Sequence, residues 1–279
     1  MRIGLVLPER DAVALARAAD AAGLAAVLVD AGDSSAALAA EVAALTTYTR
    51  LIVPVLLGSE HPVTLAEEIA VIDQLSGGRV IALVDTAGLS AAEAAEDLGL
   101  LREAWSSRWI THDGPRWTVP ARLHGESSPE AIAVTPSPAQ LEVPVWLRGS
   151  AAEELAGATG LPRLGETGLD PASVDRHRPA PVLLPLSGAL DDDRRAIHDA
   201  VASGASIALV SLEHADAGAI EQHVARYLVP EAAMPVFPRI IAESRWPARW
   251  PGIAGSDAGE PGFNPPRTVS SNRDALDID

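Results

Sequence analysis

The first 84 residues alternate between short apolar runs and longer amphipathic segments, and this alternation limits the fold more than any other feature. The apolar runs predict buried strands, because each is short and rich in Val, Ile and Leu. Strands are expected at 2–7, 25–30, 50–57 and 79–84, with helices at 10–22, 34–47 and 62–75 between them. Because each helix joins two strands through short loops, the strands are expected to run parallel with right-handed crossovers. A barrel and a doubly wound sheet are both compatible with this half of the chain.

The second half continues the pattern after an excursion. A helix is expected at 90–107, and Asp113-Gly114 between two β-prone runs is typical of a hairpin. Residues 120–142 are rich in Pro, Ser and Glu, which indicates a segment outside the sheet. Further strands are expected at 144–149, 161–165, 181–186 and 206–212, with helices at 150–158, from 191 onward and at 215–228. The total of about eight strand–helix units predicts an α/β fold of the (β/α)₈ type, a TIM barrel with its excursion between strands four and five.

The periodic pattern ends near Ser244, so we expect a barrel domain at 1–243 and an irregular C-terminal tail at 244–279. Trp246, Trp250 and Phe263 are large apolar residues within this tail. Two interpretations stay open. Either the tail lies along its own barrel or along a partner's, or it is a loose terminus.

Charge and composition exclude several classes of function. The net charge is −17, and no basic cluster offsets it, so nucleic-acid binding is not expected. The chain has no cysteine, which excludes disulfides and thiolate catalysis, and its seven histidines lack the spacing of a metal site. No leader pattern opens the chain, and no apolar run approaches the roughly 20 residues of a membrane helix. We therefore expect a cytoplasmic protein without membrane or metal.

Four segments, in the right order and spacing, resemble the bacterial-luciferase-like flavin monooxygenase superfamily. They are residues 3–8 (IGLVLP), 61–79 (HPVTLAEEIAVIDQLSGGR), 101–105 (LREAW) and 136–150 (PSPAQLEVPVWLRGS). The run at 72–79 is the most specific of them. The similarity extends over roughly residues 1–230, which covers most of the predicted barrel.

The resemblance implies a barrel with an FMN or F420 site at the carboxyl ends of its strands, where barrel enzymes place their chemistry. It implies oxidation of a small organic substrate, either monooxygenation with reduced flavin and O₂ or hydride transfer with the deazaflavin. The cofactor would supply the redox chemistry and the protein would supply binding and shielding. The resemblance also implies a dimer through the early helices, either a homodimer or a heterodimer with a related barrel subunit.

Two strand ends depart from the family's pattern. The family usually carries a His after strand two, where this chain has Asp30 and Asp33. Either Asp could act as a base, and Asp33 is equally suited to cap the next helix. After strand four the family has a Gly-rich stretch near the flavin phosphate, where this chain places Asp85. A carboxylate there would repel a phosphate.

The end of strand five carries Arg148-Gly149-Ser150 before a helix N-terminus. These residues either form an anion site in which Arg148 replaces the missing cation, or simply turn the chain. His61 follows strand three, where it could reach a ligand or cap the next helix. The candidate catalytic residues are therefore Asp30, Asp33 and His61, and the candidate cofactor-binding residues are Val55, Leu56, Asp85, Arg148, Gly149 and Ser150.

Two functions are compatible with these residues. The resemblance favours an oxidoreductase that uses FMN or F420. The missing His and the presence of Asp85 favour the alternative, a non-catalytic barrel homologue or partner subunit that has lost flavin binding.

Overall fold

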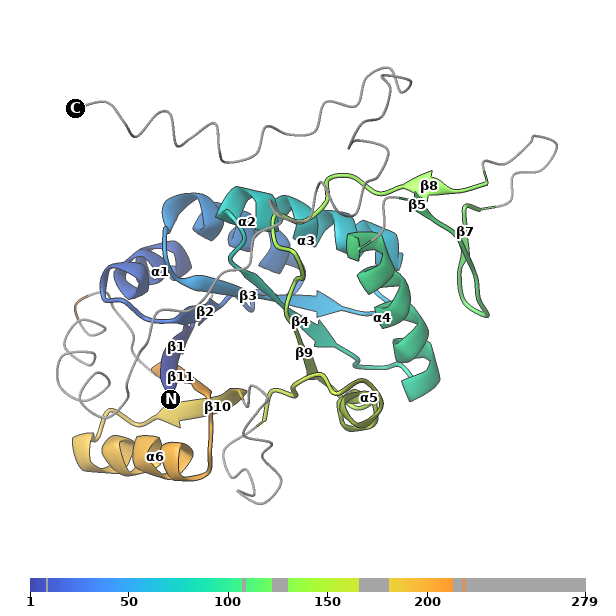
Figure 1. The fold of residues 1–279 in the computed structure, drawn as a ribbon. Coiled ribbons are helices and arrows are strands. Elements are labelled where there is room, and N and C mark those ends of the chain that lie inside the picture. Colours follow the sequence, from blue (N-terminus) through green and yellow to red (C-terminus); the bar gives the residue numbers. More distant parts are fainter. Residues whose placement is uncertain (9, 107–108, 122–129, 166–180, 213–217, 219–279) are drawn as a thin grey trace, which may run out of the picture.

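A computed structural model describes residues 1–8, 10–106, 109–121, 130–165, 181–212 and 218. The helix expected at 215–228, apart from residue 218, and the tail at 244–279 lie outside the described residues. Seven parallel strands form one curled sheet in the order β10-β11-β1-β2-β3-β4-β9 (Figure 1). They are β1 (Arg2–Val6), β2 (Ala26–Leu28), β3 (Arg50–Leu56), β4 (Val80–Asp85), β9 (Val145–Arg148), β10 (Pro181–Leu186) and β11 (Ile207–Leu212).

Residues 162–165 close the sheet into a barrel. Leu147 pairs in parallel with Arg163, and Gly165 pairs in parallel with Val182. The backbone N–H of Leu164 donates to the carbonyl of Leu147, and that of Leu183 donates to Gly165, each across 2.9 Å. Hydrogen bonding therefore continues from β9 through this short segment to β10. The predicted barrel is confirmed, and in place of the weak strand expected near 161–165 the structure has isolated parallel bridges at Arg163 and Gly165.

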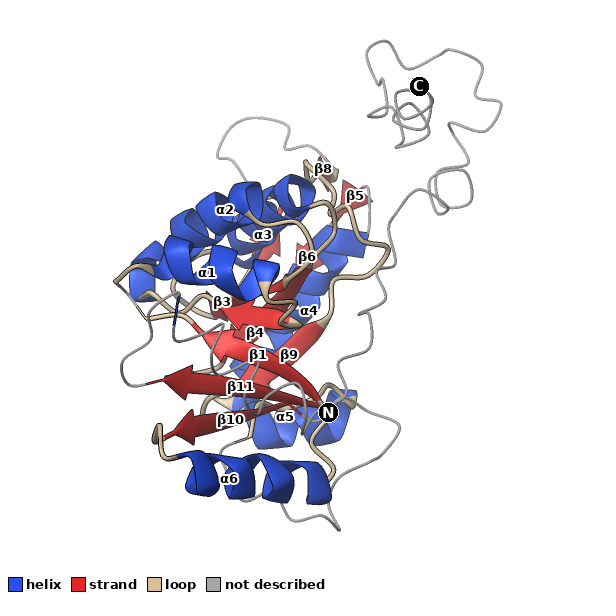
Figure 2. Cartoon of the chain, turned by 90° about the vertical axis from the view of Figure 1, so that its left-hand side faces the viewer, coloured by secondary structure: helices blue, strands red, loops and turns tan. Residues whose placement is uncertain are grey.

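The helices lie around the outside of the strands, as both views show (Figures 1 and 2). They are α1 (Ala12–Ala21), α2 (Ser35–Leu45), α3 (Pro62–Ser76), α4 (Ala91–Ser106), α5 (Ala152–Thr159) and α6 (Leu190–Ala202), with a 3₁₀ turn η1 (Gly32–Ser34). The sequence explains the bounds of α3. His61 caps it by accepting a hydrogen bond from the N–H of Val63, Pro62 occupies its first turn, and Gly77 ends it at φ 65°.

The inside of the barrel is filled mainly by residues of the strands. One buried cluster combines Ala26, Leu28, Ile52, Ile81, Leu83, Trp146, Ile207 and Leu209. Gly4 leaves room for this packing, because a Cβ there would stand 2.7 Å from Cδ2 of Leu209 and 2.8 Å from the carbonyl oxygen of Ala26. A second, larger cluster fills the space between strands and helices. A core inside the ring of strands rules out the doubly wound alternative.

The excursion after α4 forms two small ladders. The strands β6 (His112–Asp113) and β7 (Thr118–Val119) make the predicted hairpin, and β5 (Trp109–Ile110) pairs with β8 (Ile132–Ala133). The hairpin is fastened to the first half of α4, because the backbone N–H groups of Arg116 and Trp117 donate to the carboxylate of Glu96. The excursion therefore rests on the barrel's outer layer rather than entering the sheet.

Residues 72–79, the segment most specific to the family, lie at the amino ends of the strands. Asp73 is fully buried and accepts hydrogen bonds from the backbone and side-chain amides of Gln140, at 2.9 and 2.8 Å. Arg79 is also buried and donates to the carbonyl oxygens of Ala43, Thr46, Thr49 and Ser76. Burial raises the pKa of Asp73, against the hydrogen bonds from Gln140, which lower it. The run at 72–79 thus holds helices and strands together, at the end opposite the predicted site.

Candidate functional site

Three charged side chains meet at the carboxyl ends of the strands. Asp85 ends β4, Arg148 ends β9, and Asp30 follows β2. Leu28, Leu83 and Trp146, each two residues earlier, belong to the cluster inside the barrel. Because side chains alternate along a strand, Asp30, Asp85 and Arg148 point to the same inner side and line the mouth.

Arg148 bridges the two carboxylates. Its Nη1 lies 2.6 Å from Oδ2 of Asp30, and its Nε lies 2.7 Å from Oδ2 of Asp85. The side chains of Arg148, Asp30 and Asp85 are 27%, 35% and 17% exposed. We call this arrangement the Asp30–Arg148–Asp85 bridge. It joins the ends of β2, β4 and β9, with β3 lying between β2 and β4, and its three side chains carry a net charge of −1.

The charges of the bridge stabilise one another. Burial lowers the pKa of Arg148, but the hydrogen bond and charge of Asp30 and those of Asp85 together outweigh burial and raise the pKa. Two short charge-assisted hydrogen bonds fix the guanidinium in one orientation. The cation expected at the end of strand five is present, and both of its partners are carboxylates of the chain itself.

The loops after β4 and β9 pack directly on each other. Gly149 has φ 97°, and a Cβ there would stand 2.8 Å from both Oδ1 of Asp85 and Oγ1 of Thr86. The Thr86 hydroxyl donates to the carbonyl of Arg148 and accepts from the N–H of Ala151, at 3.2 and 3.0 Å. Gly149 is thus needed for close approach, and Thr86 is a residue of the site that sequence reasoning missed. Its position directly after Asp85 was the available signal.

These residues do not fit a phosphate group at the ends of β4 and β9. The N–H of Ala87 already donates to Asp85, and that of Ala152 to the carbonyl of Gly149. Glu153 and Glu154 occupy the first turn of α5, which would also repel an anion. Ser150 is exposed beside them.

The remaining candidates lie in different places. Leu56 is 43% exposed at the end of β3, whereas Val55 is buried between the sheet and the helices. Of these two, only Leu56 can face the mouth. Asp33 lies within η1. His61 packs its ring edge-on against Trp117 at a centroid distance of 4.5 Å, outside the Asp30–Arg148–Asp85 bridge.

The surroundings of His61 favour the neutral form of its ring. Burial lowers the pKa of His61 most, the charge of Asp97 raises it and that of His112 lowers it further. Its Nδ1 accepts the N–H of Val63 at 3.1 Å, so the other ring nitrogen carries the proton of the neutral form. Trp117, its neighbour from the hairpin, was not predicted, although the Asp113-Gly114 signal had located the hairpin.

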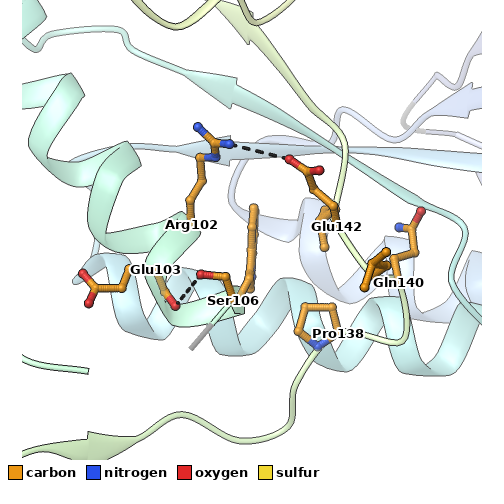
Figure 3. A pocket seen from close by; sticks show the side chains of 9 residues that line it. Arg102, Glu103, Ser106, Pro138, Gln140 and Glu142 are labelled. Carbon is orange, nitrogen blue, oxygen red and sulfur yellow. Dashed lines mark hydrogen bonds and ion pairs between the residues drawn. The ribbon is translucent and has the colours of Figure 1, made fainter. Parts of the chain in front are cut away.

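A cavity of about 380 Å³ lies elsewhere, between the end of α4 and residues 138–143 (Figure 3). Its lining includes Arg102, Trp105 and Gln140, and Arg102 approaches Glu142 at 3.6 Å. Because Gln140 bonds to the carbonyl of Val80 at the start of β4, this cavity belongs to the amino end of the barrel. It is separate from the mouth.

Within the described ranges, no group of three or more His, Asp or Glu side chains is arranged to hold a metal ion. Among the same residues, no helix has both the length and the apolar character that crossing a membrane requires.

A closed parallel barrel with a charged mouth at the carboxyl ends of its strands defines the class of barrel enzymes and their homologues. The family model for luciferase-like monooxygenases matches residues 5–176, and the chain belongs to this family. A comparison with curated proteins found no match.

Solved structures share the fold. Monooxygenase RslO1 from Streptomyces bottropensis superposes with a TM-score of 0.65 at 15% identity, covering 84% of this chain and 100% of that one. The coenzyme F420 dependent tetrahydromethanopterin reductase of Methanopyrus kandleri gives 0.65 at 12%, covering 83% and 99%. The oxygenating constituent of 3,6-diketocamphane monooxygenase from Pseudomonas putida, in complex with FMN, gives 0.50 at 20%, covering 66% of each chain.

Proposed function

We propose that this chain is a luciferase-like oxidoreductase that acts on a small organic substrate at the barrel mouth, either by monooxygenation with reduced FMN and O₂ or by hydride transfer with F420. One observation carries the proposal: polar, partly exposed side chains converge at the carboxyl ends of β2, β4 and β9 in a barrel of this family. Barrel enzymes place their chemistry at this end. The similar structures named for FMN and for F420 support both cofactors equally.

The chain's own residues would shape the ligand's surroundings. The Asp30–Arg148–Asp85 bridge supplies fixed hydrogen-bonding groups at the mouth, and Leu56 supplies an exposed apolar surface beside them. A flavin, when bound, would supply the redox chemistry. No described residue is assigned to its phosphate.

The second candidate is a barrel homologue or partner subunit that has lost flavin binding. The specific observation in its favour is that Arg148, at the end of β9, is bound by two carboxylates. Such a subunit would keep the fold and support a related barrel chain.

Titration of the purified chain with FMN, reduced FMN and F420 separates the two functions. We expect micromolar binding, measured by fluorescence, that weakens at least tenfold in Leu56→Trp because the larger ring obstructs the mouth. The matched control is Val201→Trp on α6, since Val201 is 40% exposed and Leu56 is 43% exposed. Absence of binding up to millimolar ligand would rule out the oxidoreductase function for the isolated chain and favour the partner subunit.

A further inference from the structure

We infer that the Asp30–Arg148–Asp85 bridge closes the anion site at the ends of β4 and β9, so that a flavin's phosphate gains no affinity from Arg148. The inference rests on the proposed function, because it concerns how a ligand would sit in that mouth. It names a ligand preference: at these strand ends the chain accepts the ring of a flavin but not its phosphate.

The contacts of Arg148 oppose phosphate binding at its guanidinium. Its Nε and Nη1 each face one carboxylate oxygen, at 2.7 and 2.6 Å, from opposite sides of β3. A phosphate that took the place of either bond would have to displace Asp30 or Asp85. The displaced carboxylate would stay on its strand end and repel the phosphate.

The backbone of the two loops also opposes phosphate binding. The N–H groups of Ala87, Ala151 and Ala152 point into contacts within the loops, to Asp85, Thr86 and Gly149. Oδ1 of Asp85 lies only 2.8 Å from the position that a Cβ of Gly149 would take. A phosphate laid on the backbone at Gly149 would therefore meet a carboxylate at close range. Two guanidinium N–H groups and these three loop amides are thus already bonded to acceptors of the chain, and an anion bound to the remaining donors would lie beside two carboxylates.

The test compares FMN with riboflavin, which lacks the phosphate, by quenching of flavin fluorescence. For the unmodified chain we expect the two affinities to agree within about threefold. In the double variant Asp30→Asn, Asp85→Asn the guanidinium loses both charged partners. FMN should then bind at least tenfold more tightly than riboflavin, with a preference that falls as salt rises.

A charge-matched control is needed because the chain carries a net charge of −17. Asp191→Asn with Asp192→Asn removes the same two charges from the exposed first turn of α6 and should leave the ratio near one. Circular dichroism checks that each variant folds. If the double variant does not fold, the single variants Asp30→Asn and Asp85→Asn replace it. Each should then show a smaller gain in affinity for FMN relative to riboflavin.

The outcomes separate this inference from the proposed function. Binding of neither ligand to the unmodified chain removes the proposed function, and FMN binding gained in the double variant would still uphold the inference. The inference is overturned if adding Arg148→Gln to the double variant leaves its preference for FMN in place, because the gain would then not come from the released guanidinium. It is also overturned if releasing Arg148 leaves FMN no tighter than before.

Discussion

The indole N–H of Trp117 donates to Oδ1 of Asp97 across 2.6 Å, joining the hairpin of the excursion to a fully buried carboxylate of α4. Arg116 binds the same carboxylate through Nε and Nη2, at 2.9 and 3.2 Å. Trp117 in turn packs against His61 at the start of α3. Asp97 therefore holds together three segments that meet beside the barrel: α3, α4 and the hairpin.

Asp97→Asn should destabilise the chain by about 2 kcal/mol, because the fully buried carboxylate loses its charge-assisted hydrogen bonds to Arg116 and Trp117, while Arg116 keeps its ion pair with Glu93. The loss is measured by urea denaturation, followed by tryptophan fluorescence. Glu41→Gln, at an exposed position on α2, is the control and should change stability by less than about 0.5 kcal/mol. Equal stability of the two variants would show that the hairpin is not anchored through Asp97.

Two glycines predict opposite effects of the same substitution. Gly149→Ala should cost at least about 2 kcal/mol, because its φ of 97° is strained for alanine and its Cβ would press on Asp85, Thr86 and the backbone at Ala87. Gly157→Ala, within α5 and with nothing near its added Cβ, should stabilise by about 0.5–1 kcal/mol. Thermal melting of both variants measures the difference, and a similar shift in both would contradict the close packing of the two loops.

The strand–helix order could be read from the sequence because parallel strands form continuous apolar runs and each helix has its own start and stop signals. The same continuity hides which strand residues face inward. Val55 and Leu56 are both apolar, yet Val55 packs under the helices and Leu56 is exposed. A difference of one position changes the face, and nothing in a run of apolar residues marks it.

The position of Arg148 at a strand end was also predictable, but its partners were not. Asp30 and Asp85 are 118 and 63 residues away in sequence, and only closure of the barrel brings them to the guanidinium. The same limit applies to Trp117, which reaches Asp97 because the hairpin folds back on α4. Long-range pairs of this kind leave no local pattern.

Asp20 makes part of the stability depend on pH. Burial would raise the pKa of Asp20, but hydrogen bonds from the N–H groups of Thr49, Thr47 and Tyr48 together outweigh burial and lower it from 3.8. A lowered pKa in the folded chain means that the contribution is complete above about pH 5 and is lost as the pH falls through the folded value. Asp20→Asn should therefore be less stable than the unmodified chain at pH 6, with a difference that shrinks below pH 3.8.

Urea denaturation at pH values from 6 down to 3 measures this difference. Asp199→Asn, at an exposed position of α6, is the control and should change stability by less than about 0.5 kcal/mol. A difference for Asp20→Asn that stays constant across this range would mean that the three backbone hydrogen bonds do not favour the charged carboxylate.

Exposed apolar side chains on the early helices favour self-association of the chain. Val71 and Leu75 are 44% and 54% exposed and lie four residues apart, so they share one face of α3. Leu45 at the end of α2 is also exposed, and α2 packs directly on α3. Apolar side chains gathered on neighbouring helices favour a partner surface of the same kind, and we expect a homodimer.

Light scattering after size-exclusion chromatography measures the mass directly. The unmodified chain should have a mass twice the 28.9 kDa of one chain. The double variant Val71→Asp, Leu75→Asp should have the mass of a monomer, because a symmetric interface would bury each new charge beside its copy. Val201→Asp on α6 places a similar charge on a different face and should remain dimeric. A monomer at every concentration of the unmodified chain would contradict the homodimer and direct the search to a related barrel subunit as the partner of this face.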